Sequence, residues 1–211
     1  MDDGRAPGSG ARSRARKPTP AERREQRSGV EDPAAVLEAG ARFLEARPRS
    51  VAEVRRKLTG LGYRPELVAG AVERLAELGF LDDEAFARAW VESRDRAKPR
   101  GEHALRRELG LKGVDRGIVD AVLGDRRDDA IVAAEALDQP AVGPDDAAAE
   151  RLLRRKLAPI LREADPRKRL QRSYALLARN GFGPDVCSAV SRRVLAREDP
   201  TADGADVGPY A

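Results

Sequence analysis

The segment Leu78–Val114, LGFLDDEAFARAWVESRDRAKPRGEHALRRELGLKGV, joins two helical units and contains the helix and turn pattern that recurs along the chain. Asp82 or Asp83 can cap the helix after the glycine turn, because a short carboxylate accepts the free backbone N–H groups of a first turn. Phe86 and Trp90 lie four residues apart and therefore share one face of that helix. We predict that both rings belong to a hydrophobic core.

The second half of this segment predicts a break in the chain and then another helix. Lys98–Gly101 contains a proline and a glycine, which disfavour a continuous helix. Leu105 and Leu109 have the spacing of an inner helix face, and Arg106 and Arg107 lie on the outer face. The segment therefore places a dense basic group between two helical units.

The same order of helix, glycine turn and helix occurs three times in the chain. A shift of 51 residues aligns Gly62 with Gly113, and a shift of 68 aligns Gly113 with Gly181. Apolar positions on both sides of each turn align under the same shifts. Glycine suits the residue after a helix C-terminus because that residue takes a positive φ. We therefore predict a repeat protein, with the 17 extra residues of the second shift between positions 124 and 149.

The composition favours helices and small cores. Ala, Leu, Arg and Glu dominate, and aromatic residues make up only 4% of the chain, too few for one large core. We predict an all-α fold, an elongated array of three tandem three-helix modules with about nine helices. The predicted divisions are a disordered basic N-terminal tail at 1–33, a first module at 34–80, a second module at 81–124, a partly helical insertion at 125–144, a third module at 145–197 and an acidic disordered C-terminal tail at 198–211.

The sequence offers little for catalysis or metal binding. One histidine and one cysteine exclude an internal disulfide, a cysteine-built metal site and a histidine-based triad. We interpret His103 as a surface residue and Cys187, which aligns with apolar positions of the other repeats, as a core residue. The acids of Asp82–Glu84 lie in a first helical turn, where capping explains them. With no phosphate-binding loop or dinucleotide fingerprint, we expect a non-enzyme without cofactor, catalytic residue or metal site.

The chain lacks the sequence features of membrane and secreted proteins. No apolar run approaches the roughly 18 residues that a membrane span needs, and the N-terminus has no apolar signal core. We therefore expect a cytoplasmic protein. No sustained heptad pattern indicates a coiled coil, and we expect a monomer.

Basic side chains are the strongest functional signal, although the net charge is only +4. Arg55 and Arg56 recur as Arg106 and Arg107 under the shift of 51 residues. Such cations either form a solvated face or form a contact surface that neutralises phosphates or meets an acidic protein groove. The candidates for a contact surface are Arg49, Arg55, Arg56, Lys57, Arg94, Lys98, Arg100, Arg106, Arg107, Lys112, Arg154, Arg155 and Lys156.

Three stretches together resemble the RecX family of regulators of the RecA recombinase. They are ARPRSVAEVRRKLTGLGY at 46–63, the segment at 78–114 quoted above, and LARNGFGPDV at 177–186. The resemblance covers residues 34–196 and leaves out both tails and the insertion. It implies nine helices in three modules and a non-enzymatic protein that binds RecA filaments on DNA. It also implies inhibition of ATP hydrolysis and strand exchange, which regulates recombination, DNA repair and the SOS response.

The resemblance implies two partners, the RecA nucleoprotein filament and the phosphate backbone of DNA without sequence preference. Our assignment of the contact to the basic candidates rests on periodicity and charge rather than on the family. The alternative is a helical DNA-binding protein that acts alone, such as a transcription regulator. Against it, no helix carries the Asn-, Gln- and Ser-rich set of a base-reading helix.

Overall fold

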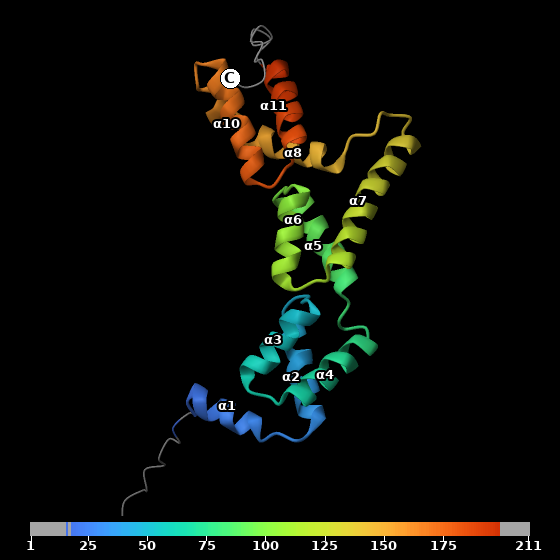
Figure 1. The fold of residues 1–211 in the computed structure, drawn as a ribbon, viewed down its shortest axis with the longest axis vertical. Helices are drawn as coiled ribbons and strands as arrows, with labels where there is room; N and C mark the ends of the chain where they lie inside the picture. Colours follow the sequence, from blue (N-terminus) through green and yellow to red (C-terminus); the bar gives the residue numbers. More distant parts are fainter. Residues whose placement is uncertain (1–15, 17, 199–211) are drawn as a thin grey trace, which may run out of the picture.

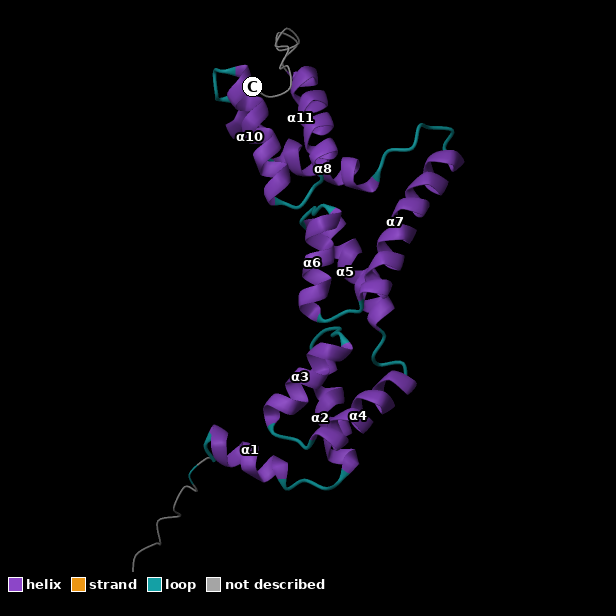
Figure 2. Ribbon diagram, in the orientation of Figure 1, coloured by secondary structure: helices purple, strands orange, loops and turns teal. Residues whose placement is uncertain are grey.

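The structure is a computed structural model that describes residues 16 and 18–198, and within them it contains eleven α-helices and no strand. Three bundles of helices follow one another along the long axis of the molecule (Figures 1 and 2). The predicted all-α array of three tandem modules is therefore confirmed.

Each module consists of three principal helices, and two further helices lie outside this pattern. The first module contains α2 (Pro33–Glu45), α3 (Val51–Leu61) and α4 (Pro65–Glu77), the second α5 (Asp83–Ala97), α6 (Glu102–Lys112) and α7 (Arg116–Ala136), and the third α8 (Pro144–Arg155), α10 (Pro166–Arg179) and α11 (Pro184–Glu198). The additional helices are α1 (Pro20–Ser28) and the short α9 (Leu157–Leu161).

Each module has a hydrophobic core of its own, which explains how a chain with few aromatic residues folds. Leu58, Leu109 and Leu177 occupy equivalent positions in the three cores, and all three are 0% exposed. Full burial of such a side chain contributes about 2 kcal/mol. Phe86 and Cys187 are buried as predicted, whereas Trp90 is only partly buried against the second core.

The middle helices α3, α6 and α10 end at the glycine turns that the sequence predicts, and α3 begins at a capping motif. Ser50 and Glu53 form a capping box at the start of α3, in which each side chain accepts a hydrogen bond from the backbone N–H of the other residue. Gly62, Gly113 and Gly181 follow the three helices with φ of 103°, 80° and 83°. These left-handed turns end the helices at matching positions, so the repeat predicted from the glycines is confirmed.

The C-terminal ends of α6 and α10 meet the N-terminal ends of α3 and α6, the middle helices of the preceding modules. The Ser50 hydroxyl donates a hydrogen bond of 2.6 Å to the carbonyl of Lys112, and the Gly101 N–H donates one of 3.1 Å to the carbonyl of Asn180. The three helices thus stack end to end in Figure 1. Their dipoles lie head to tail, which is favourable because carbonyl ends face N–H ends.

A carboxylate from the next module completes each junction. Asp83 Oδ1 accepts the Val51 N–H at 2.9 Å, and Asp145 Oδ2 accepts the Glu102 N–H at 2.9 Å. Burial raises the pKa of Asp83, with the neighbouring Asp82 adding to the effect and the Val51 N–H opposing it. The two module junctions are therefore built by one recurring arrangement.

Asp83 does not have the role that the sequence suggested. Asp82 alone caps α5, accepting the N–H groups of Glu84 and Ala85 at 2.8 and 3.0 Å. Asp83 instead caps α3, a helix of the preceding module. Local spacing identifies a capping carboxylate but does not reveal that its acceptor atoms face another module.

The predicted disordered tail at 1–33 needs correction, because residues 20–28 form α1. Thr19 and Glu22 make a capping box and Pro20 occupies the first turn, so the helix start is well specified. The helix has no buried residue, and its sequence therefore has no apolar face to recognise. Residues 1–15 and 17 of the predicted N-terminal tail, and residues 199–211 of the predicted acidic tail, lie outside the described residues.

The predicted boundary between the second module and the insertion, at 124/125, falls inside a helix. Helix α7 continues through Gly124 to Ala136 without a break. A Cβ built on Gly124 would meet nothing within 4 Å, and a glycine inside a helix weakens it by about 1 kcal/mol without ending it.

Candidate contact surface

Glu53 of α3 gathers three cations at the junction of the first and second modules. Lys112 Nζ lies 2.8 Å from Glu53 Oε1, Arg47 Nη2 lies 3.5 Å from it, and Arg49 Nη1 lies 4.0 Å from it. Burial opposes ionisation of Glu53, but hydrogen bonds from Lys112 and the Ser50 N–H, and the charges of Lys112 and Arg47, outweigh burial. The pKa of Glu53 is therefore below its ordinary value.

Two aromatic rings position four of the basic side chains. The Arg49 guanidinium lies 4.3 Å from the centre of the Phe43 ring, and Lys57 Nζ lies 5.5 Å from it. The Trp90 ring has Arg94 at 4.2 Å and Lys112 at 5.0 Å. A cation over an aromatic ring gains about 0.5–1 kcal/mol at exposed sites. The rings therefore orient these cations without neutralising them.

Glu108 of α6 gathers the polar groups around Trp90 and extends them toward the third module. It accepts hydrogen bonds of 2.9 Å from Trp90 Nε1 and 2.6 Å from Arg94 Nε. Arg100 Nε lies 3.5 Å from the same carboxylate, and its guanidinium also donates to the side-chain oxygen of Asn180. A chain of contacts thus crosses both module junctions.

Six cations linked by these contacts form what we call the junction surface. They outnumber the two carboxylates among them, Glu53 and Glu108, and leave a local excess of positive charge. The six are Arg47, Arg49, Lys57, Arg94, Arg100 and Lys112.

The structure brings five of the predicted candidates into the junction surface and gives four others structural roles. Arg56 donates to the Lys112 carbonyl at 3.3 Å, and Arg155 donates to the Ala97 carbonyl at 3.0 Å, so both join modules. Arg106 is paired with Glu102 and Asp120, and Arg154 with Glu150. The remaining candidates are exposed and make no ion pair with any residue that the structure describes: Arg55, Lys98, Arg107 and Lys156.

Sequence reasoning missed Arg47, Glu108 and the polar role of Trp90. Trp90 and Glu108 lie 18 residues apart on different helices, so no local spacing indicates their hydrogen bond. The spacing of Ser50 and Glu53 indicates a capping box and nothing more, because the contact of Glu53 with Lys112 spans 59 residues. The surplus of positive charge was predictable, whereas the carboxylates that organise it were not.

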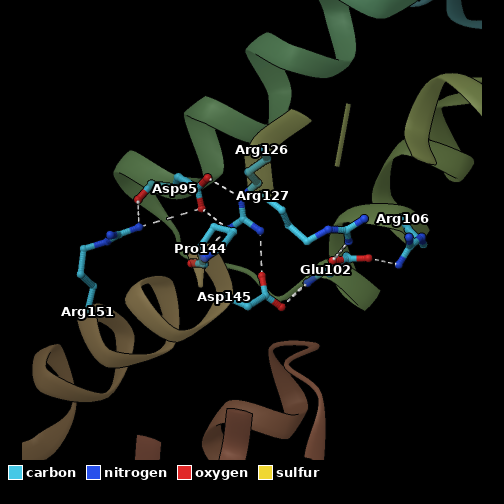
Figure 3. Close-up of polar contacts among 8 residues, drawn as sticks. All are labelled: Asp95, Glu102, Arg106, Arg126, Arg127, Pro144, Asp145 and Arg151. Carbon is cyan, nitrogen blue, oxygen red and sulfur yellow. Dashed lines mark hydrogen bonds and ion pairs between the residues drawn. The ribbon is translucent and has the colours of Figure 1, made fainter. Parts of the chain in front are cut away.

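A second charged cluster, drawn in Figure 3, joins the second and third modules. The Arg126 side chain is 9% exposed, and it pairs with Asp95 at 2.8 Å and Asp145 at 2.7 Å. Burial lowers the pKa of Arg126, but its hydrogen bonds to both carboxylates and their charges outweigh burial and raise it. Arg151 lies 4.0 Å from Asp95 on the far side. Because the largely buried Arg126 is held by carboxylates from the second and third modules, we interpret this cluster as a structural clasp.

Glu102 extends the clasp along the start of α6. It pairs with Arg127 at 2.8 Å and with Arg106. Burial again opposes its ionisation, but the Arg127 hydrogen bond and the charges of both arginines lower the pKa of Glu102. Sequence spacing does not reveal this cluster, because Arg126 and Arg127 lie 19 to 31 residues from the carboxylates that they contact.

The residues most suggestive of chemistry have structural surroundings. His103 is exposed, and Cys187 is fully buried, where burial raises the pKa of its thiol. Within the described part of the chain, no group of three or more His, Cys, Asp or Glu side chains is arranged to hold a metal ion. No helix of that part is long and apolar enough to span a bilayer.

The fold and the junction surface define a tandem helical-repeat protein, a class whose stacked units present long surfaces to extended partners. Family models for the first and second three-helix domains of RecX match residues 37–75 and 82–123. The regulatory protein RecX of Mycobacterium sp. (strain JLS) is 36% identical over 160 residues, which cover 74% of this chain and 80% of that protein. The chain belongs to the RecX family.

Further relatives agree with this assignment. The regulatory protein RecX of Mycolicibacterium smegmatis is 34% identical over 160 residues, covering 74% of this chain and 78% of that protein. The crystal structure of RecX from Lactobacillus salivarius superimposes with a TM-score of 0.64 at 19% identity, covering 78% of this chain and 97% of that one. At this identity the structural match supports the shared fold alone.

Proposed function

We propose that this chain binds RecA filaments on DNA, inhibits RecA ATP hydrolysis and strand exchange, and so regulates recombination, DNA repair and the SOS response. It does so as a cytoplasmic monomer without catalytic activity or cofactor of its own. The observation that carries the proposal is the junction surface, six cations around two carboxylates that extend from the first module along the second to its junction with the third.

The contacts that hold these cations favour binding to an extended anionic partner. Arg94 and Lys112 lie against Trp90, and Arg49 and Lys57 lie against Phe43, so their side chains are partly ordered before a partner arrives. Ordering a long side chain on binding costs about 0.5–1.5 kcal/mol, and prior ordering reduces that cost. Phosphates or acidic side chains of a filament groove can then compete with Glu53 and Glu108 for the same cations.

The second candidate function is a DNA-binding protein that acts alone. Arg55 and Arg107 support it, because both are exposed on the middle helices of two successive modules and make no ion pair with a described residue, so they could neutralise phosphates of bare duplex. This reading predicts that affinity for bare duplex falls steeply with salt and that RecA is not required.

The test is a titration of RecA ATPase on single-stranded DNA. We expect the wild-type chain to suppress the ATPase, and the variant Lys57→Gln/Arg94→Gln/Lys112→Gln to need roughly tenfold more protein for equal suppression. The matched control, Arg42→Gln/Arg74→Gln/Arg116→Gln, removes three cations of exposed pairs outside the junction surface and should behave as wild type. Circular dichroism checks that all variants are equally helical.

Two outcomes would contradict the proposal. If the wild-type chain leaves RecA ATPase unchanged over a wide concentration range, the regulatory function is wrong. If the control variant loses as much suppression as the junction variant, net charge rather than the junction surface determines binding.

A further inference from the structure

Helix α7 continues well beyond its last anchoring contacts. Arg126 and Arg127 pair with Asp95, Asp145 and Glu102, and the chain then runs out to residue 136 and returns through 137–143. Arg126 also donates to the Pro144 carbonyl at 3.5 Å, so it closes the base of this excursion. We call residues 128–143 the arm, which Figure 1 shows leaning away from the modules before the chain turns back to α8.

The arm contributes no buried residue to either neighbouring core, yet it is rich in apolar side chains. Its 16 residues account for nearly all of the 17 by which the second repeat interval exceeds the first. Ile131, Val132, Leu137 and Val142 are 47%, 63%, 67% and 52% exposed, and they are half of the eight large hydrophobic residues exposed in the described chain. Clustered exposed apolar side chains mark interaction sites more often than scattered ones do.

The charge of the arm indicates what kind of partner covers it. Asp128, Asp129, Glu135 and Asp138 are all exposed, and residues 128–143 contain no lysine or arginine in a chain that has 40. An acidic border repels phosphate, which argues against nucleic acid. It equally disfavours the arm of a second copy, because like charges would face one another.

We infer that the arm docks a partner protein through a surface with an apolar centre and a basic border. This inference rests on the proposed function in one respect, because it takes the partner to be the RecA protomer in the filament. The chain then uses two surfaces of opposite charge, the junction surface for anionic groups of the complex and the arm for a basic, apolar protein surface.

A fluorescent label can test the arm directly. Cys187, the only cysteine, is 0% exposed, so Val132→Cys adds the one readily labelled thiol. With an environment-sensitive dye at position 132, we expect a blue shift when RecA filaments on single-stranded DNA are added. The control is the dye at Ala76→Cys, an exposed position on α4, which should not shift.

A functional readout complements the label. We expect Ile131→Ser/Val132→Ser to need roughly tenfold more protein for equal suppression of RecA ATPase, with unchanged affinity for single-stranded DNA. The control Ala69→Ser/Ala76→Ser makes the same number of serine substitutions at exposed positions of α4, outside the arm, and should match wild type.

Each outcome bears on either the arm or the proposed function. The arm inference is overturned if the dye at position 132 shifts with DNA alone or on adding unlabelled chain. It is also overturned if the dye does not shift with filaments and the Ile131/Val132 variant suppresses the ATPase as well as wild type does. If the wild-type chain fails to suppress RecA ATPase, the proposed function is wrong. A shift at position 132 with filaments would in that case still support docking of the arm.

Discussion

Substituting Gly113 tests whether the module junctions are close-packed. A Cβ built on Gly113 would lie 2.4 Å from the Cβ of Ala52, whereas one built on Gly79 would meet nothing within 4 Å. Gly113 and Gly79 have similar positive φ, 80° and 76°. Gly79→Ala therefore measures the backbone cost alone, and Gly113→Ala measures that cost together with the collision at the junction.

The expected difference follows from the geometry. A non-glycine residue in the left-handed region costs about 1 kcal/mol. To relieve a 2.4 Å contact between Gly113→Ala and Ala52, the modules must separate, which lengthens the 2.6 Å hydrogen bond from Ser50 to the Lys112 carbonyl. Loss of that bond and of part of the Lys112–Glu53 pair adds about 2 kcal/mol to the backbone cost. Gly113→Ala should therefore lower the free energy of unfolding by about 3 kcal/mol.

The assay is urea unfolding followed by circular dichroism, with the Ala52→Gly variant completing a double-mutant cycle. Ala52→Gly alone should cost about 1 kcal/mol, because glycine weakens a helix. In the double variant the colliding Cβ of Ala52 is gone, so its total cost should be lower than the sum of the two single costs. Equal costs for Gly113→Ala and Gly79→Ala, or an additive cycle, would refute the close-packed junction.

Three further perturbations follow from the structure. Arg126→Ala should lower the free energy of unfolding by about 3–5 kcal/mol in urea titrations, because two partly buried carboxylates lose their partner. A loss below about 1 kcal/mol would contradict the role of Arg126 as a clasp. Leu109→Ala should lower the free energy of unfolding by about 2–5 kcal/mol, because Leu109 is fully buried. Leu111→Ala, at a position 75% exposed, should lower it by less than about 0.5 kcal/mol. Equal melting temperatures of the two variants would contradict this. The pKa of Glu53 is lower in the folded chain than its unfolded value near 4.5, so its stabilisation is present above that pH and is lost as the pH falls through the folded pKa. Glu53→Gln should therefore reduce the loss of stability between about pH 7 and pH 3.5, and an unchanged pH dependence of the unfolding free energy would show that the Lys112 pair contributes nothing.

Local patterns predicted the repeat because each repeat is specified locally. Gly62, Gly113 and Gly181 adopt the positive φ that their position after a helix requires. Leu58 and Leu109 are buried because helical periodicity places them on the inner face. Such features need only the few residues around them, and an individual sequence reveals them.

Features that depend on contacts between modules were not predictable in the same way. Asp83 caps a helix that begins 32 residues earlier, and Arg126 of α7 joins carboxylates from two other helices. Helix α1 was missed for a different reason, because a helix without an apolar face has no periodic signal. For the basic candidates, the sequence predicted an excess of charge. Arg56 proved to be hydrogen-bonded to a backbone carbonyl and Arg106 to be ion-paired, whereas Arg55 and Arg107 make no ion pair within the described part of the chain.

The end-to-end stacking of α10, α6 and α3 gives the array a direction. Each middle helix presents N–H groups toward one end of the molecule and carbonyl groups toward the other, so the two ends are chemically unlike. The first-module end terminates on α1, where a Cβ on Gly62 would lie 2.5 Å from Arg24 Cγ. An extended partner that has a direction of its own can therefore distinguish the two ways of laying the array along it, and parallel and antiparallel placements are different complexes.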